Sequence, residues 1–389
     1  MNNVVKQYII IKMVCITKVL KGGVLSMDIV TSEEHYKISE GESVRISVLK
    51  VLLSVLVVYV HSYATEIKFT SGNVNFIVPE WLATFKYVCS HAIAGCAVPG
   101  FFFLAAILLY RKEFFWRENM FKKLRTLLVP YILLNTFWIF VFWVGQSIPR
   151  FSVYFANPDN IVSSWGIYGW LKAYGLVDPG KLPLLYQMWF VRNLVVLNVL
   201  AVVLKKIIDI WPKGSLVFAM ILWFVPLGID GYTKSSLTFW ILGYLCVVYN
   251  IRDEALKGKF RLIVLSYIVL LALDCLLRDT VPYSFIHHLT VMFGIVFFYI
   301  CSMYIVERQS LHWVSSLATF SITIYFFHEM SLGILRKICG KIFPATTFVQ
   351  FTEYVFIPIV IVIWCILLSL VLRQLSPRIY NLLTGNRGW

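Results

Sequence analysis

Long apolar segments recur along almost the whole of this 389-residue chain. Hydrophobic residues make up 59% of it and charged residues only 14%, whereas soluble domains carry about a quarter charged residues. A helix needs about 20 apolar residues to cross the hydrocarbon of a bilayer. Ten candidate spans lie at roughly 47–64, 86–110, 126–146, 188–204, 214–229, 236–250, 261–277, 285–306, 314–333 and 351–373. We therefore predict an all-α integral membrane protein, a single polytopic bundle of about ten transmembrane helices.

The pattern divides the chain into a leader, a membrane domain and a tail. We expect a leader at 1–43, with Met27 as a candidate true start, a transmembrane domain at 44–375, and a tail at 376–389. The fifth and sixth spans are short and bracket Gly228, Asp230 and Gly231. They are expected to form either a tight hairpin or a partly re-entrant pair.

The basic residues indicate how the chain sits in the membrane. The segment 111–125 is rich in Lys and Arg, while the preceding connection 65–85 holds Lys68 alone. By the positive-inside rule, 111–125 is cytoplasmic, which places both termini in the cytoplasm and the protein in the cytoplasmic (inner) membrane. Loops 205–213 and 250–260 agree, but Arg336, Lys337 and Lys341 would then lie outside. The net charge of +15 is spread over short loops, which argues against nucleic acid as a partner.

Two ionisable residues interrupt the first apolar span. Lys50 and His61 are eleven positions apart, about 16 Å along a helix and on one face, which Ser47 and Ser54 share. A charge in hydrocarbon costs at least about 2.5 kcal/mol, so such a stripe should face protein or water. One interpretation is structural, with Lys50 reaching the interface and His61 bonding to another helix. The other is functional, with a neutral imidazole acting as a general base.

Other polar positions are candidates for the same site. Lys122 and Arg125 stand side by side at a helix entering the membrane and could hold phosphates. Tyr325, His328 and Glu329 lie inside the ninth span, where His328 and Glu329 point about 100° apart and each needs a partner elsewhere. The remaining candidates are Trp189, Arg192 and Asn193 at the start of the fourth span, and the aromatic residues of connection 147–187, namely Trp165, Tyr168, Trp170, Tyr174 and Tyr186. These aromatics form either an interfacial belt or a platform for a sugar.

Several common catalytic motifs are missing from the sequence. There is no Walker loop, GxSxG or HExxH, which argues against ATP-driven transport, serine hydrolysis and zinc proteolysis. The eight cysteines have no metal-ligand spacing and look like small buried hydrophobic residues. We therefore expect no metal.

Taken together, these residues resemble the acyltransferase-3 family, whose members are multi-span O-acyltransferases of surface polysaccharides and related glycans. Its Arg-x10-His signature is matched by Lys50 and His61, and its Arg-x-x-Arg motif by Lys122 and Arg125. Further blocks match at 98–104, 189–194, 239–243 and 321–328, so the resemblance covers about 44–375. The chain departs from the pattern at Ser47, at Ala105-Ala106, and at Lys50 and Lys122, where Lys keeps the charge but lacks the guanidinium fork.

The resemblance implies a donor, an acceptor and a set of roles. An acyl-CoA, usually acetyl-CoA, would bind through Lys122 and Arg125, with Lys123 or Arg111 assisting. His61 would take the proton from a hydroxyl of a surface polysaccharide or lipid-linked glycan, directly or through an acyl-His61 intermediate, while Lys50 stabilises negative charge or holds a donor phosphate. A second interpretation is a transporter of a glycan or lipid-linked sugar, in which His61, His328 and Glu329 would be its polar lining. A third interpretation is a structural partner of a polysaccharide synthase.

Overall fold

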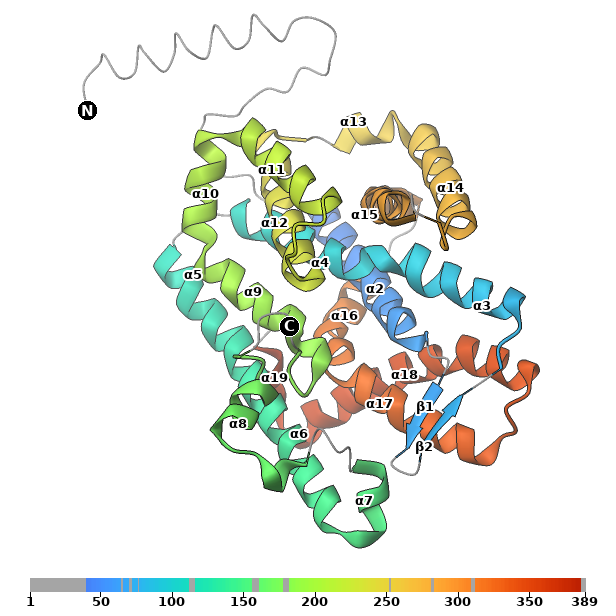
Figure 1. The fold of residues 1–389 in the computed structure, drawn as a ribbon. Coiled ribbons are helices and arrows are strands. Elements are labelled where there is room, and N and C mark those ends of the chain that lie inside the picture. The colour runs from blue at the N-terminus through green and yellow to red at the C-terminus, as the bar shows by residue number, and fades with distance from the viewer. Residues whose placement is uncertain are drawn as a thin grey trace, which may run out of the picture.

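The computed structural model describes residues 40–385 except 64–65, 70–71, 76, 112–115, 156–160, 178–181, 252, 281–282 and 309–311. The expected leader up to residue 39, including Met27, lies outside the described residues, as do the last four residues of the expected tail. Within the described ranges the chain is helical apart from one short hairpin of two strands, so the all-α fold class is confirmed. Figure 1 shows the helices gathered into one bundle.

The first half of the chain builds the centre of the bundle and one of its ends. Its elements are α2 (Glu40–Ser62), β1 (Glu66–Phe69), β2 (Gly72–Asn75), α3 (Glu80–Tyr87), the π-helix η1 (Val88–Ile93), the 3-10 turn η2 (Ala94–Cys96), α4 (Ala97–Tyr110), α5 (Trp116–Lys123), the π-helix η3 (Leu124–Leu128), α6 (Val129–Ser147), α7 (Pro149–Phe155), the 3-10 turn η5 (Val162–Ser164) and α8 (Ile167–Ala173). Strands β1 and β2 are antiparallel, with Glu66 opposite Asn75.

The second half contributes α12 to this centre and adds further helices around it. Its elements are the 3-10 turn η6 (Tyr186–Met188), α9 (Trp189–Val199), α10 (Ala201–Ile210), α11 (Pro212–Phe224), α12 (Gly231–Val248), α13 (Asp253–Lys257), α14 (Phe260–Leu276), α15 (Tyr283–Arg308), α16 (His312–Ala318), α17 (Ser321–Ile342), α18 (Thr347–Leu375) and α19 (Pro377–Thr384). The connection between α11 and α12 is the tight hairpin foreseen around Gly228, because the two helices pack on each other and Asp230 caps α12 by accepting from the Thr233 amide at 2.9 Å.

About ten spans are not confirmed. Among the described residues, five helical segments are long and apolar enough to cross a membrane, at Glu40–Ser62, Glu80–Tyr110, Met120–Ser147, Tyr283–Glu307 and Thr347–Leu375. A sixth arises if α10 and α11, bent by 116°, are counted together. Most of the other expected spans are helical but shorter or interrupted: α14 has 17 residues, α9 ends at Val199, and α16 is separate from α17.

The centre of the bundle is tightly packed around α4 and α12. Phe102, Phe239 and Trp240 are fully buried there. A side chain at Gly243 would collide with the carbonyl oxygen of Phe103, so the glycine allows the two helices to approach closely. Helix α2 lies beside them and also contacts α15, α16, α17 and α18. The outer helix α18 instead exposes Phe356, Ile359, Ile363 and Trp364, as expected for a helix that faces lipid.

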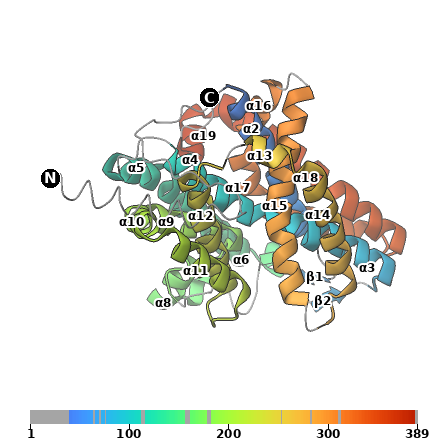
Figure 2. The same cartoon turned by 90° about the horizontal axis from the view of Figure 1, so that it is seen from above.

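The two ends of the bundle carry different elements. Strands β1 and β2 follow α2 at one end, and α13 and α16 lie at the other (Figure 2). The expected tail contains α19, which packs on α6 and ends at Gly385 in the left-handed conformation (φ 62°). Because α2 runs between the two ends, it places its first turn at one surface and His61 near the other.

Candidate functional site

Helix α2 carries both ionisable residues of the first span. It is unbroken from Glu40 to Ser62. Glu40 and Glu42 lie in its first turn, where the helix dipole stabilises carboxylates. Lys50 and His61 therefore lie about 16 Å apart along one side of the helix. Ser54 donates to the Lys50 carbonyl at 2.8 Å, so its hydroxyl is already used within the helix. The polar face of α2 therefore has two separate parts, one around Lys50 and one around His61.

The imidazole of His61 is held by Tyr186. The His61 Nδ1 and Tyr186 Oη atoms are 2.7 Å apart, and the Tyr186 hydroxyl also interacts electrostatically with the Glu329 carboxyl. Burial and the neighbouring Glu329 carboxyl raise the pKa of Tyr186, so its hydroxyl stays protonated at neutral pH. A chain of contacts therefore runs from a carboxyl through a phenol to an imidazole.

A second imidazole faces the first. The rings of His61 and His328 have centroids 5.1 Å apart and are inclined by 48°. His328 is fully buried, and its Nδ1 lies 2.8 and 2.9 Å from the carbonyl oxygens of Ile324 and Tyr325. Since carbonyls only accept, Nδ1 carries the proton and Nε2 of the neutral ring is the acceptor. Among the residues that the structure describes, this Nε2 has no hydrogen-bond partner.

Arg336 closes the site from α17. Its guanidinium donates to the His61 carbonyl at 3.1 Å and to the Ser62 carbonyl, and it interacts electrostatically with Glu329. The last carbonyls of a helix have no hydrogen-bond partner within the helix, and a cation near them is stabilised by the negative end of the helix dipole. Arg336 thus fixes the end of α2 and holds a charge beside Glu329. It belongs to α17, as do Lys337 and Lys341, and does not lie in a loop.

Tyr325 positions the turn that contains Tyr186. The Tyr325 hydroxyl donates to the Gln187 carbonyl, and its ring lies 5.3 Å from that of Phe190. The Gln187 side chain is buried, and neither of its amide atoms has a hydrogen-bond partner within the described part of the chain. Polar atoms left in this way in the residue next to Tyr186 mark a place where a ligand can find donors and acceptors.

The predicted residues of α9 support this turn from behind. Trp189 packs on Phe102 and Tyr232, with ring centroids 5.9 and 4.6 Å away. Arg192 donates to the Gly175 carbonyl at 2.9 Å, and Asn193 donates to the Ser236 hydroxyl at 3.2 Å. These three residues link the connection that follows α8 to helices α9 and α12.

The basic residues predicted to hold the donor are divided between two places. Arg111 forms an ion pair with Glu42, which Arg45 also approaches, and Arg45 in turn pairs with Asp253. This network lies at the first turn of α2, about 28 Å along the helix from His61. The others lie elsewhere: Lys122 and Lys123 end α5, and Arg125 lies in η3, next to α9 and α19. Lys122 and Arg125 are exposed and Lys123 is partly buried.

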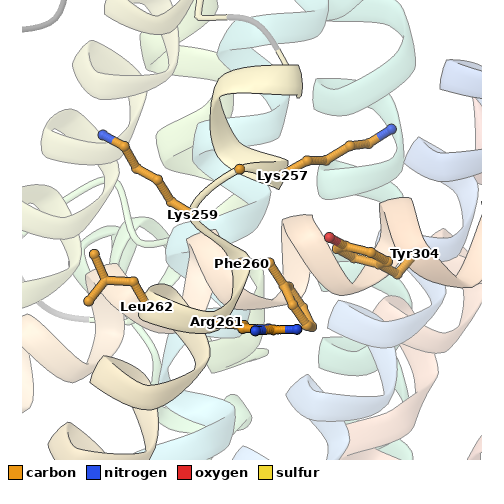
Figure 3. Close-up of a pocket in the computed structure, with 7 residues that line it drawn as sticks. Lys257, Lys259, Phe260, Arg261, Leu262 and Tyr304 are labelled. Carbon is orange, nitrogen blue, oxygen red and sulfur yellow. The ribbon is translucent and has the colours of Figure 1, made fainter.

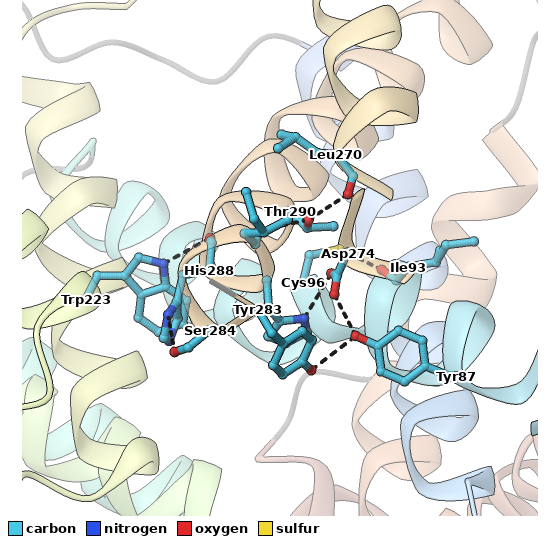
Figure 4. A network of polar contacts seen from close by, with 12 residues as sticks. Tyr87, Ile93, Cys96, Trp223, Leu270, Asp274, Tyr283, Ser284, His288 and Thr290 are labelled. Carbon is cyan, nitrogen blue, oxygen red and sulfur yellow. Dashed lines mark hydrogen bonds and ion pairs between the residues drawn. The ribbon is translucent and has the colours of Figure 1, made fainter. Parts of the chain in front are cut away.

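A second polar cluster joins α3, α14 and α15. Asp274 is fully buried and accepts from the Tyr87 hydroxyl at 2.6 Å, and its other oxygen is 3.0 Å from His287 Nδ1 (Figure 4). Tyr283 lies 3.1 Å from the Tyr87 hydroxyl, and His91 stacks on Tyr87 from the π-helix η1. A buried carboxylate in a membrane bundle needs such partners. The cluster therefore ties three helices together beside α2.

The described residues hold no group of three or more His, Cys, Asp and Glu that could bind a metal ion. The seven described cysteines are free thiols.

The polar groups around His61 are suited to proton transfer, because an imidazole with one nitrogen held by an acceptor keeps the other nitrogen available as a base.

Comparison with known families identifies the class of protein. A model of the acyltransferase domain of the acyltransferase-3 family matches residues 44–370. The chain therefore belongs to the acyltransferase-3 family and is a membrane acyltransferase that requires an acyl donor and an acceptor. The searches of curated proteins and of solved structures gave no match.

The structure brings together only part of the predicted site. His61, Tyr325, His328 and Glu329 meet at one end of α2, whereas Lys50, Arg111, Lys122, Lys123 and Arg125 lie at other levels or on other helices. Sequence reasoning placed Tyr186 among the interfacial aromatics and treated Arg336 as a topological anomaly. That anomaly was the available signal, since an arginine on the wrong side of a membrane protein needs a buried partner.

Proposed function

We propose that this acyltransferase moves an acyl group, most simply acetyl, from acyl-CoA to a hydroxyl of a surface polysaccharide or lipid-linked glycan. His61 is the general base. The observation that carries the proposal is the 2.7 Å contact between His61 Nδ1 and the Tyr186 hydroxyl, whose pKa is raised by burial and by the neighbouring Glu329 carboxyl. Family membership supports the reaction class, and this arrangement supports the choice of base.

The direction of the hydrogen bonds decides which nitrogen of His61 reacts. If Tyr186 donates its only proton to Glu329, its oxygen can only accept from His61 Nδ1–H. The neutral ring then presents Nε2 as the basic atom. In the transfer step, Nε2 takes the hydroxyl proton of the acceptor while the oxygen attacks the thioester carbonyl. The C–S bond breaks, and the CoA thiolate recovers the proton from His61. Glu329 and Tyr186 stabilise the transient imidazolium.

An acyl-His61 intermediate is the alternative course of the same reaction. His61 would attack the thioester, release CoA, and pass the acyl group to the acceptor. The adjacent His328 offers a second imidazole whose Nε2 can accept the hydroxyl proton in that second step. Acid-quench capture of labelled protein after mixing with labelled acetyl-CoA alone separates the two courses.

The donor is proposed to enter from the end of α2 that carries its first turn. Lys122, Lys123 and Arg125 are accessible cations that suit the phosphates of CoA. Arg111 is already paired with Glu42. Its proposed role is therefore to support this region, and it does not bind a phosphate on its own. Lys50 lies between this end and His61, where it can hold a donor phosphate or stabilise negative charge. The expected orientation makes this the cytoplasmic end in the cytoplasmic membrane.

Replacing the proposed base is the direct test. His61→Ala should abolish acyl transfer from labelled acetyl-CoA to a glycan acceptor while the protein inserts and purifies normally. His288→Ala is the matched control, because this histidine of α15 contacts Trp223 and Ser284 and lies outside the site. Full activity in His61→Ala would refute the role of His61, and glycan movement without label would favour a transporter.

The donor site has a separate test. Lys122→Ala combined with Arg125→Ala should weaken acyl-CoA binding without abolishing transfer at saturating donor. Lys206→Ala combined with Lys213→Ala removes two exposed cations from α10 and α11 and serves as the control. Unchanged CoA affinity in the first variant would place the donor elsewhere.

A further inference from the structure

A basic pocket lies at the end of the bundle opposite His61. It has a volume of about 480 Å³ and is lined by Lys257, Gly258, Lys259, Phe260, Arg261, Leu262 and Tyr304. It lies where the chain leaves α13 and enters α14, against the last turns of α15. Figure 3 shows the three cationic side chains around it, with Lys257 and Lys259 extending to opposite sides and Arg261 beneath Phe260. The proposed mechanism makes no use of this pocket.

The charges around the pocket are mostly positive. Lys257 pairs with Glu307, the nearest acidic group. Lys259 and Arg261 are exposed, and no ion pair to either is found within the described ranges. Arg261 presents a planar fork that fits a phosphate, and a lysine stem is flexible enough to turn its ammonium toward one. These cationic side chains therefore favour a ligand that carries a phosphate group.

The walls of the pocket are apolar and aromatic. Phe260 and Tyr304 pack with ring centroids 4.3 Å apart, as aromatic residues do at the level of lipid headgroups. Leu262, at the rim, begins a stripe of exposed apolar residues that continues down α14 through Leu265, Ile268 and Leu276. These positions recur at helical spacing on one face. A ligand whose phosphate contacts the cations would have its acyl chains next to this exposed apolar face of α14.

We propose that the pocket binds the headgroup of an anionic phospholipid, with Lys259 and Arg261 contacting its phosphate and the exposed face of α14 holding its chains. The pocket shares its end of the bundle with α13, whose Asp253 joins it to Arg45 at the first turn of α2. A bound lipid would therefore brace the end of the bundle from which the donor is proposed to enter. Basic pockets between membrane helices recognise anionic headgroups by these same forces.

The test uses the purified full chain, stripped of lipid in detergent, with phosphatidylglycerol and phosphatidylcholine as probes. Native mass spectrometry and thermal unfolding should show saturable phosphatidylglycerol binding that weakens with salt. Lys259→Ala with Arg261→Ala should weaken it about 30-fold, from the contribution of two basic residues near a membrane surface. Lys259→Arg with Arg261→Lys, which keeps both charges, should retain most of the binding.

Control variants and a second ligand decide the outcome. Lys206→Ala with Lys213→Ala removes the same charge from α10 and α11 and should leave phosphatidylglycerol binding unchanged. An equal loss in this control would mean only general attraction to an anionic surface, and equal binding of the zwitterionic phosphatidylcholine would show no preference for an anionic headgroup. Stabilisation by millimolar inorganic phosphate without lipid would identify a soluble ligand. Each of these three results overturns the proposal, and none bears on acyl transfer by His61, which is measured separately.

Discussion

Removing the hydroxyl of Tyr186 is the sharpest test of how His61 is activated. Tyr186→Phe keeps the ring that packs 5.3 Å from the imidazole of His61 but deletes the oxygen 2.7 Å from its Nδ1. The interaction of that hydroxyl with the Glu329 carboxyl is lost with it. The substitution therefore separates the ring contact, which is structural, from the hydrogen-bonded link between carboxyl and imidazole.

The expected loss follows from the number and kind of bonds removed. A hydrogen bond that involves a charged group contributes about 1.5–3 kcal/mol, and each 1.36 kcal/mol in the barrier is a factor of ten in rate. The link to Glu329 strengthens when His61 becomes an imidazolium, so the loss appears in the transition state. We expect kcat to fall about 10- to 100-fold with little change in KM for acetyl-CoA. A positioned base contributes about 10² to 10⁴-fold, so the loss should not exceed that of His61→Ala.

The assay is transfer of labelled acetyl groups under initial-rate conditions, with thermal unfolding as the check on folding. Tyr249→Phe, at a partly buried tyrosine that follows the end of α12, is the matched control and should keep wild-type rates. Glu329→Gln should reduce kcat to a similar degree, and the double variant should be no slower than the worse single variant, because both act through one chain of bonds. Wild-type kcat in Tyr186→Phe, or fully additive losses in the double variant, would show that His61 works without this link.

Two further predictions concern stability. Arg336→Leu leaves the His61 and Ser62 carbonyls uncapped and Glu329 without its cation, which should destabilise the fold by about 3 kcal/mol and lower the unfolding temperature. Lys213→Leu, at an exposed position at the start of α11, should change it little. Asp274→Asn weakens the charge-assisted bonds to Tyr87 and His287 and should lower stability by about 1–3 kcal/mol in the same assay. Asp279→Asn, 89% exposed, is its control, and equal unfolding temperatures for the two Asn variants would contradict a stabilising role for the Asp274 cluster.

The class of fold could be predicted from the sequence because a membrane restricts the chain so strongly. Apolar runs of sufficient length leave few alternatives to helices, and α2, α6, α15 and α18 lie close to the expected positions. The count of spans could not be predicted in the same way. Hydropathy measures length and polarity, but it does not detect the break at Leu200, which lies within the fourth expected span. The expected loop 205–213 is instead helical up to Ile210, and the chain bends by 116° at Trp211, directly before Pro212.

The candidate site was predictable to the extent that its members are costly in a membrane. His61, His328 and Glu329 were found because ionisable groups in apolar helices need partners. Tyr186 lies in a connection rich in aromatic residues, where nothing in its own neighbourhood distinguishes it from an interfacial anchor. Its role depends on the Tyr325 hydroxyl, which holds the turn from a helix about 140 residues further along the chain. Contacts of that separation have no local signature.

The attachment of α2 at both ends sets the geometry of any transfer across the bundle. The Glu42, Arg45, Arg111 and Asp253 network holds its first turn, and Arg336 holds its last carbonyls. A helix secured in this way cannot slide along its axis without breaking ion pairs at one end or the other. With the roles proposed for Lys50 and His61, the spacing of about 16 Å between them is then a fixed length that the donor would span. A synthetic inhibitor that joins a phosphate mimic to a carbonyl mimic would need a linker of that reach, and shorter compounds would engage one level only.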